Sequence, residues 1–127
     1  MTISRTEWGK QFNRCWICGA VDGWNGNRYT ALETHELVGN SRRARALTIA
    51  PSWLRVCSDC HSQLSSSPSV EELARSLAIK AQYDPENYDL EAVNKLLSPN
   101  RRGGWSDGPV TQSDVDAMAE VIFGRNR

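Results

Sequence analysis

The sequence has no excess of charge of either sign. Its 127 residues carry 15 lysines and arginines against 15 aspartates and glutamates, so the formal net charge is zero. The overall basic character typical of many nucleic-acid-binding proteins is therefore absent. The charges are unevenly distributed, however, with eight basic and five acidic residues in 1–66 but seven basic and ten acidic residues in 67–127. A surface that binds phosphate groups would therefore belong to the first half.

The chain also lacks long apolar runs. It has no stretch of about 18 apolar residues that could cross a membrane, and its N-terminal residues lack the apolar segment of a secretory signal peptide. We therefore expect no membrane partner and a cytoplasmic location. In such a reducing compartment, paired cysteines are more often metal ligands than disulfides.

Cysteine is scarce, but its spacing is informative. The four cysteines form two C-x2-C pairs, Cys15 with Cys18 and Cys57 with Cys60, and such pairs can complete a tetrahedral shell of sulfur around one ion. Two disulfides would need an oxidising compartment, a redox C-x2-C motif leaves the second pair unexplained, and an iron–sulfur cluster is a less common use of four cysteines. The preferred interpretation is a structural Zn²⁺ whose binding energy is largely folding energy.

Histidine is scarcer still, and both histidines lie close to this predicted zinc site. The first pair of cysteines is separated from the second by 38 residues, too many for a plain zinc ribbon. This insert contains His35 and Glu36 near the end of a predicted strand over residues 29–37, and His61 directly follows the last cysteine. A second predicted strand covers residues 53–56, and a helix is expected to begin at Ser58. The zinc site would thus bring both histidines onto rigid elements.

Residues 12–66 resemble the HNH endonuclease family, in which two strands and a helix hold one divalent metal ion. The family pattern runs C-x2-C-G, a strand ending in Asp-His or His-His, an Asn, and C-x2-C-His. The resemblance implies an α+β, ββα-metal fold and a metal-dependent DNA endonuclease, of a type common in phages and mobile elements and so expected in a bacterial or phage-infected cell. By position, His35 and His61 would bind a catalytic Mg²⁺ or Mn²⁺. Glu36 replaces the usual catalytic histidine, and Ser52 replaces the asparagine.

Two alternatives to this assignment stay open. In the preferred register, His35 and His61 are metal ligands and Glu36 is the general base. In a shifted register, His35 is the base and Glu33, two residues earlier on the same strand face, is a ligand. The alternative function is a non-catalytic zinc module that binds DNA or a protein on a decayed HNH scaffold.

Arginines and tryptophans are candidates for nucleic-acid contacts. Arg42, Arg43 and Arg45 lie between the two predicted strands, and arginine makes forked hydrogen bonds with phosphate oxygens. Trp16 and Trp53 flank the cysteine pairs and are expected to pack around the zinc core. The remaining tryptophans could stack on bases, but packing in the core or in turns is the favoured interpretation: Trp8, Trp24 and Trp105.

The second half, residues 67–127, is predicted to be a helical extension of a zinc-stabilised domain over residues 1–66. Apolar residues at helical spacing predict one helix from Ser67-Pro68 to the Asp84-Pro85 break and another over residues 90–97. Residues 99–109, rich in Pro and Gly, indicate a loop. A last helix is expected to be capped by Ser113, with Asp116 as its partner, and to end at Gly124. This acidic half could bind a protein partner.

Overall fold

The computed structural model describes residues 3–37, 48–64, 68–97 and 109–124. These residues form short helices and two small antiparallel sheets, which confirms the predicted α+β class. The predicted nucleic-acid residues Arg42, Arg43 and Arg45 lie outside the described residues, as do Trp105 and most of the loop predicted over residues 99–109. None of the described helices is long and apolar enough to span a membrane.

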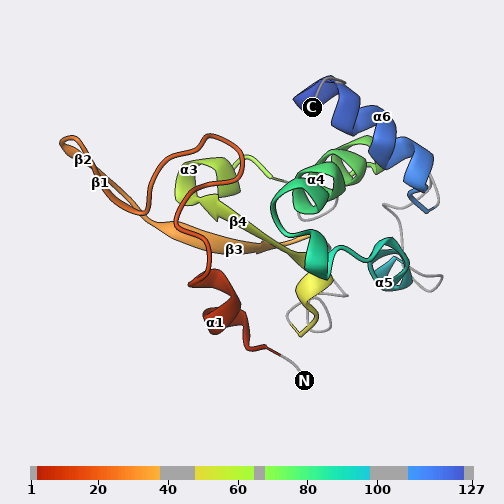
Figure 1. The fold of residues 1–127 in the computed structure, drawn as a ribbon, viewed down its shortest axis with the longest axis horizontal. Coiled ribbons are helices and arrows are strands. Elements are labelled where there is room, and N and C mark those ends of the chain that lie inside the picture. Colours follow the sequence, from red (N-terminus) through yellow and green to blue (C-terminus); the bar gives the residue numbers. More distant parts are fainter. Residues whose placement is uncertain (1–2, 38–47, 65–67, 98–108, 125–127) are drawn as a thin grey trace.

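The first half contains the strands. After helix α1 (Arg5–Gly9), strands β1 (Gly23–Asn25) and β2 (Arg28–Thr30) form a hairpin that projects from one end of the molecule (Figure 1). Strand β3 (Leu32–Glu36) pairs antiparallel with β4 (Trp53–Cys57), and a 3-10 turn, η2 (Ala50–Ser52), leads into β4. Helix α3 (Ser58–His61) follows β4 without a break, so the chain runs strand, strand, helix through this region.

The second half is helical. It contains α4 (Val70–Tyr83), a 3-10 turn η3 (Pro85–Asn87), α5 (Leu90–Leu96) and α6 (Gln112–Phe123), with α4 and α6 packed side by side (Figure 1). Buried side chains from both halves form one core, so the helices pack on the strand region. The almost fully buried core side chains include Trp8, Leu37, Trp53, Leu54, Val56, Leu73, Leu77, Val93, Leu96 and Val110. The division into 1–66 and 67–127 stays a prediction.

Three sequence predictions of element boundaries need correction. The strand predicted over residues 29–37 is interrupted at Ala31 and forms two strands, β2 and β3, which belong to different sheets. Helix α4 begins after Ser69, not at Ser67-Pro68, because the Ser69 side chain accepts a hydrogen bond from the Glu72 N–H and Glu72 returns one to Ser69. Helix α6 is capped by Thr111 with Asp114 rather than by Ser113 with Asp116.

Other predicted boundaries are confirmed. Gly124 ends α6 with a φ of 78°, a conformation that residues with a Cβ rarely adopt. The helix predicted to break at Asp84-Pro85 ends at Tyr83, and the helix predicted over residues 90–97 forms over Leu90–Leu96. Trp16 and Trp53 are buried and belong to the core cluster that also contains Cys15 and Cys57, in keeping with the expected packing.

Candidate metal centre and histidine pair

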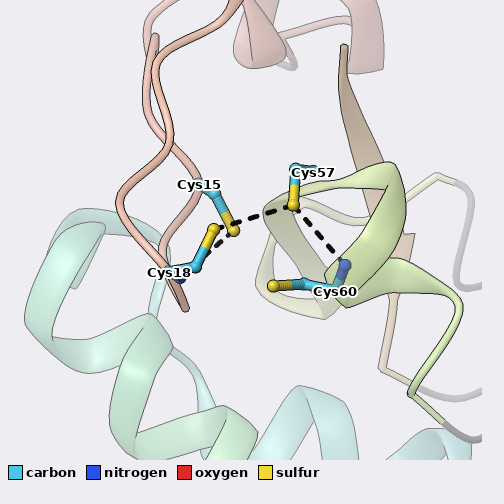
Figure 2. Close-up of side chains that lie close together, drawn as sticks. All are labelled: Cys15, Cys18, Cys57 and Cys60. Atoms are coloured by element: carbon cyan, nitrogen blue, oxygen red, sulfur yellow. Dashed lines mark hydrogen bonds between the residues drawn. The ribbon is translucent and has the colours of Figure 1, made fainter. Parts of the chain in front are cut away.

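The four cysteines meet at one point, although they come from two segments far apart in the sequence. Cys15 and Cys18 lie in the turn that follows α1, Cys57 ends β4, and Cys60 lies in α3 (Figure 2). Their sulfur atoms all lie within 4.8 Å of one another, with 3.7 Å between the sulfurs of Cys18 and Cys57, and none forms a disulfide. Tetrahedral coordination at a Zn–S distance of about 2.3 Å separates sulfurs by roughly 3.8 Å. The geometry therefore fits one metal ion.

Each C-x2-C turn points backbone N–H groups at its first sulfur. The N–H groups of Ile17 and Cys18 lie 3.4 Å from Cys15 Sγ, and the Cys60 N–H lies 3.5 Å from Cys57 Sγ. Gly19 closes the first turn with a φ of 80°. These donors favour the ionised form of the sulfurs that a metal ion requires.

The pKa values of the thiols and the repulsion between four thiolates also favour a bound cation. Burial, together with the neighbouring cysteine thiols, raises the pKa of the Cys60 thiol. Burial acts to raise the pKa of Cys15 as well, but backbone N–H donors outweigh it and lower that pKa to about 7. Four thiolates cannot share this volume without compensating charge, whereas a divalent soft cation such as Zn²⁺ would stabilise all of them. The donor set thus fits the predicted structural zinc.

The same arrangement brings the only two histidines of the chain together. The ring centroids of His35 and His61 lie 5.1 Å apart at an interplanar angle of 72°. His61 Nδ1 lies 2.6 Å from Glu33 Oε1, a hydrogen bond that orients the His61 ring. Because side chains alternate along a strand, Glu33 and His35 share one face of β3, the face that α3 covers. Glu33, His35 and His61 therefore form one polar cluster beside the cysteines.

His35 is the more buried member of this cluster. Only 7% of its surface is exposed. Burial, reinforced by the nearby His61, lowers the pKa of His35 to about 4, although the Glu36 carboxylate acts in the opposite direction. At neutral pH the His35 ring is therefore uncharged.

Glu36 lies on the other face of β3, away from the histidine pair. Its carboxylate pairs with Arg5 of α1, which also donates a 2.9 Å hydrogen bond to the backbone carbonyl of Thr34. The Thr34 hydroxyl on this face accepts a 3.0 Å hydrogen bond from Arg55. The strand alternation thus places Glu36 in the contact between α1 and the β3–β4 sheet. The preferred sequence assignment joined His35, Glu36 and His61, whereas the structure joins the two histidines with Glu33.

Ser52 serves the entry into β4. Its side chain is fully buried and its hydroxyl donates a 3.0 Å hydrogen bond to the Ile49 carbonyl, while its own carbonyl accepts a 2.7 Å hydrogen bond from the Leu37 N–H. These bonds hold the 3-10 turn η2 against the end of β3.

A hollow of about 300 Å³ opens beside His35, between β3, α3 and α4. Its polar lining includes Gln63, Glu72, Arg75 and Ser76. Sequence reasoning did not assign Glu72, Arg75 and Ser76 of α4 to the site, because nothing in a helical repeat tells which of its polar positions faces a distant strand. Arg75 is an exposed cation at this hollow, and so a candidate to contact an anionic substrate.

Comparison of the chain with protein-family models, with curated proteins and with solved structures found no match. What can be concluded about the site therefore comes from its own geometry: a cluster of four cysteines that could hold a metal ion such as zinc, with a Glu–His–His cluster next to it.

Proposed function

We propose that this protein is a metal-dependent endonuclease of HNH type, which hydrolyses phosphodiester bonds of DNA. The observation that carries the proposal is the contact of His35 with His61, whose Nδ1 is bound by Glu33, next to a four-cysteine centre. The strand–strand–helix order of β3, β4 and α3 supports the same reading, since the resemblance implies that order around the catalytic metal.

The residues divide the work as follows. His61 and Glu33 are an imidazole and a carboxylate on one surface, a donor set suited to Mg²⁺ or Mn²⁺. Such an ion, when bound there, would neutralise developing charge on the scissile phosphate. His35 has an uncharged ring and accepts a proton from the attacking water as general base. This is the shifted register considered from the sequence; Glu36 acts instead through Arg5 on the position of α1.

The proposal is tested by nicking of supercoiled plasmid with added Mg²⁺ or Mn²⁺. We expect His35→Ala and His61→Ala to lose activity by roughly 10²- to 10⁴-fold, the range typical of a lost acid–base group, and Glu33→Gln to lose a comparable share. Glu36→Gln is the matched control, because it makes the same chemical change three positions along β3, on the opposite face, and it should keep most of the activity.

The control can also contradict the assignment. If Glu36→Gln abolishes nicking in a protein that still holds its zinc while Glu33→Gln does not, then Glu36 is the base and the register is wrong. Zinc content and far-UV circular dichroism of each variant show whether a loss reflects chemistry or folding.

The second candidate is a non-catalytic zinc module that binds DNA or a protein. It is favoured by the roles of Glu36 and Ser52, the two positions that depart from the family pattern, because both are buried in structural contacts. In that case the wild-type protein would bind DNA without nicking it under any metal condition. Arg42→Ala with Arg43→Ala would then weaken binding, and the histidine substitutions would not.

A further inference from the structure

Two aromatic side chains on the projecting hairpin are left to solvent. Trp24 is 70% exposed and Tyr29 is 59% exposed, although they lie opposite each other across β1 and β2. Their rings contact each other edge to face, with centroids 5.3 Å apart. Neither belongs to the core that the described residues form, nor to the side chains packed against it. Packing, the expected role of Trp24, does not account for this pair.

The hairpin holds these rings in a fixed position. Asn25 bonds back to the chain before β1, accepting from the Val21 N–H at 3.0 Å and donating to the Val21 carbonyl at 2.7 Å. Asp22 accepts a 3.2 Å hydrogen bond from the Leu32 N–H, which ties the start of the hairpin to β3. A pair of three-residue strands is only marginally stable alone, so these anchors keep the aromatic surface ordered before any partner arrives.

A hollow lies beside the hairpin, next to the four-cysteine cluster, with Cys18, Cys57 and Cys60 in its lining. It has a volume of about 370 Å³, lies between β2 and α3, and is lined by Arg28 and Tyr29 on one side and by Asp59 and Gln63 on the other. Arg28 pairs with Asp59 across it. A nucleotide chain stacked on Tyr29 would therefore lie beside this hollow and next to the four-cysteine cluster.

We propose that the β1–β2 hairpin binds unpaired bases by stacking them on Trp24 and Tyr29, so that the substrate is single-stranded or locally unpaired DNA. Aromatic faces stack on any base, and an arginine beside them contacts the backbone phosphates. A paired duplex hides its base faces and offers nothing for these rings to stack on. This inference names the substrate of the proposed nuclease, and so it rests on that function. Base binding itself can be measured without cleavage.

The test is binding of a fluorescent 16-nucleotide oligo-dT, measured by anisotropy at physiological salt without added Mg²⁺ or Mn²⁺. We expect Trp24→Ala and Tyr29→Ala each to weaken binding by roughly ten-fold, equivalent to about 1.4 kcal/mol for one lost stacking contact. Trp24→Phe keeps an aromatic face and should retain most of the affinity. Tyr83→Leu is the control, since Tyr83 is a half-exposed aromatic residue on α4, outside the hairpin. It should bind like the wild type.

Three outcomes would overturn the inference: no binding of oligo-dT, equal affinity of the wild type for a 16-base-pair duplex, or full affinity of Trp24→Ala. Its failure is distinct from failure of the nuclease proposal. Hairpin-dependent binding by a protein that nicks no DNA would support base stacking and reject catalysis. A different result would support catalysis and reject base stacking. In that case nicking needs His35, whereas Trp24→Ala nicks DNA and binds oligo-dT as well as the wild type does.

Discussion

At the scale of single residues, Lys80 is a charged side chain buried in the core. Its side chain is fully buried, and its ammonium group donates 2.9 Å hydrogen bonds to the carbonyls of Ala50 and Trp53 and to Asp84. Asp84 also accepts a 2.8 Å hydrogen bond from the Trp8 indole. Burial lowers the pKa of Lys80, and the Asp84 carboxylate opposes that change. One charged pair thus connects α1, β4 and α4.

Removal of the Lys80 charge should therefore be costly. Lys80→Met leaves Asp84 buried without its cationic partner and removes the hydrogen bonds that Lys80 donates to the carbonyls of Ala50 and Trp53, so we expect a loss of about 3–5 kcal/mol in the free energy of unfolding. The measurement is urea denaturation of the zinc-loaded protein. Lys10→Met is the matched control at an exposed position and should change stability by less than about 0.5 kcal/mol. Equal effects of the two substitutions would contradict the role given to Lys80.

The residues of the site differ in how far the sequence could predict them. The cysteine spacing predicted the metal-binding cluster, because two C-x2-C turns have few other uses in a reducing compartment. The sequence also suggested that His35 and His61 would meet. It could not decide between Glu33 and Glu36, since their distinction depends on which face of β3 meets α3 and which meets α1. In the structure Glu36 pairs with Arg5, a contact that no local pattern reveals.

At the scale of elements, the helix starts show why boundaries are hard to read from sequence. Residues 111–116 contain two overlapping capping patterns, Thr111 with Asp114 and Ser113 with Asp116, and each has the required spacing. The structure uses the first, in which the Thr111 hydroxyl accepts from the Asp114 N–H at 3.1 Å and the Asp114 carboxylate accepts from the Thr111 N–H at 3.0 Å. Val115 then becomes the buried residue of the first turns.

This choice of cap can be tested by two neighbouring substitutions. Thr111→Ala removes a hydroxyl that binds a helix N–H, so it should lower the free energy of unfolding by about 1 kcal/mol. Ser113→Ala, inside α6, should change it by only a few tenths of a kcal/mol. Thermal or urea denaturation compares them directly. The opposite order of effects would return the helix start to the position predicted from sequence.

The same cap has a pH dependence with a defined sign. The backbone and side-chain hydrogen bonds from Thr111 lower the pKa of Asp114 below its ordinary value of 3.8. The folded state therefore holds this proton less tightly than the unfolded state. The stabilisation is complete above the unfolded value and is lost as the pH falls through the lower, folded value. Thr111→Ala should reduce the acid sensitivity of α6, as followed by NMR titration of Asp114.

At the scale of the whole molecule, the metal centre and the shared core act together. With a metal ion bound, the four cysteines would fix the turn after α1 to β4 and α3, while the Lys80–Asp84 pair fixes the strand region to α4. Composition alone could not show this coupling, because the sequence divides into halves of different charge and element type. The apolar periodicity predicts which helix faces are buried, but not that they cover Trp8 and Trp53.

Metal removal should therefore affect more than the cysteine turns. Elemental analysis should find one zinc per chain, and a strong chelator should abolish the cooperative thermal transition, because binding energy at such sites is folding energy. Cys57→Ser should behave like the chelated protein. A metal-free chain that melts with the same transition as the purified protein would contradict a structural metal centre.

The isolated first half provides a second test at this scale. In a fragment of residues 1–66, Trp8 and Trp53 would lose α4, and the Lys80–Asp84 pair that binds their polar groups would be absent. We expect this fragment to bind zinc yet to show no cooperative unfolding transition, as followed by tryptophan fluorescence during urea denaturation. A sharp transition would instead establish residues 1–66 as an independent domain.

The four cysteines of the candidate metal centre differ in their exposure to solvent. Cys15 and Cys57 are buried and Cys60 is partly covered, but Cys18 is exposed. Oxidants and alkylating reagents attack the thiolate they can reach, so damage would begin at Cys18 and would release an ion bound by the four sulfurs. Oxidation of this one sulfur in air would thus be sufficient to unfold the whole chain.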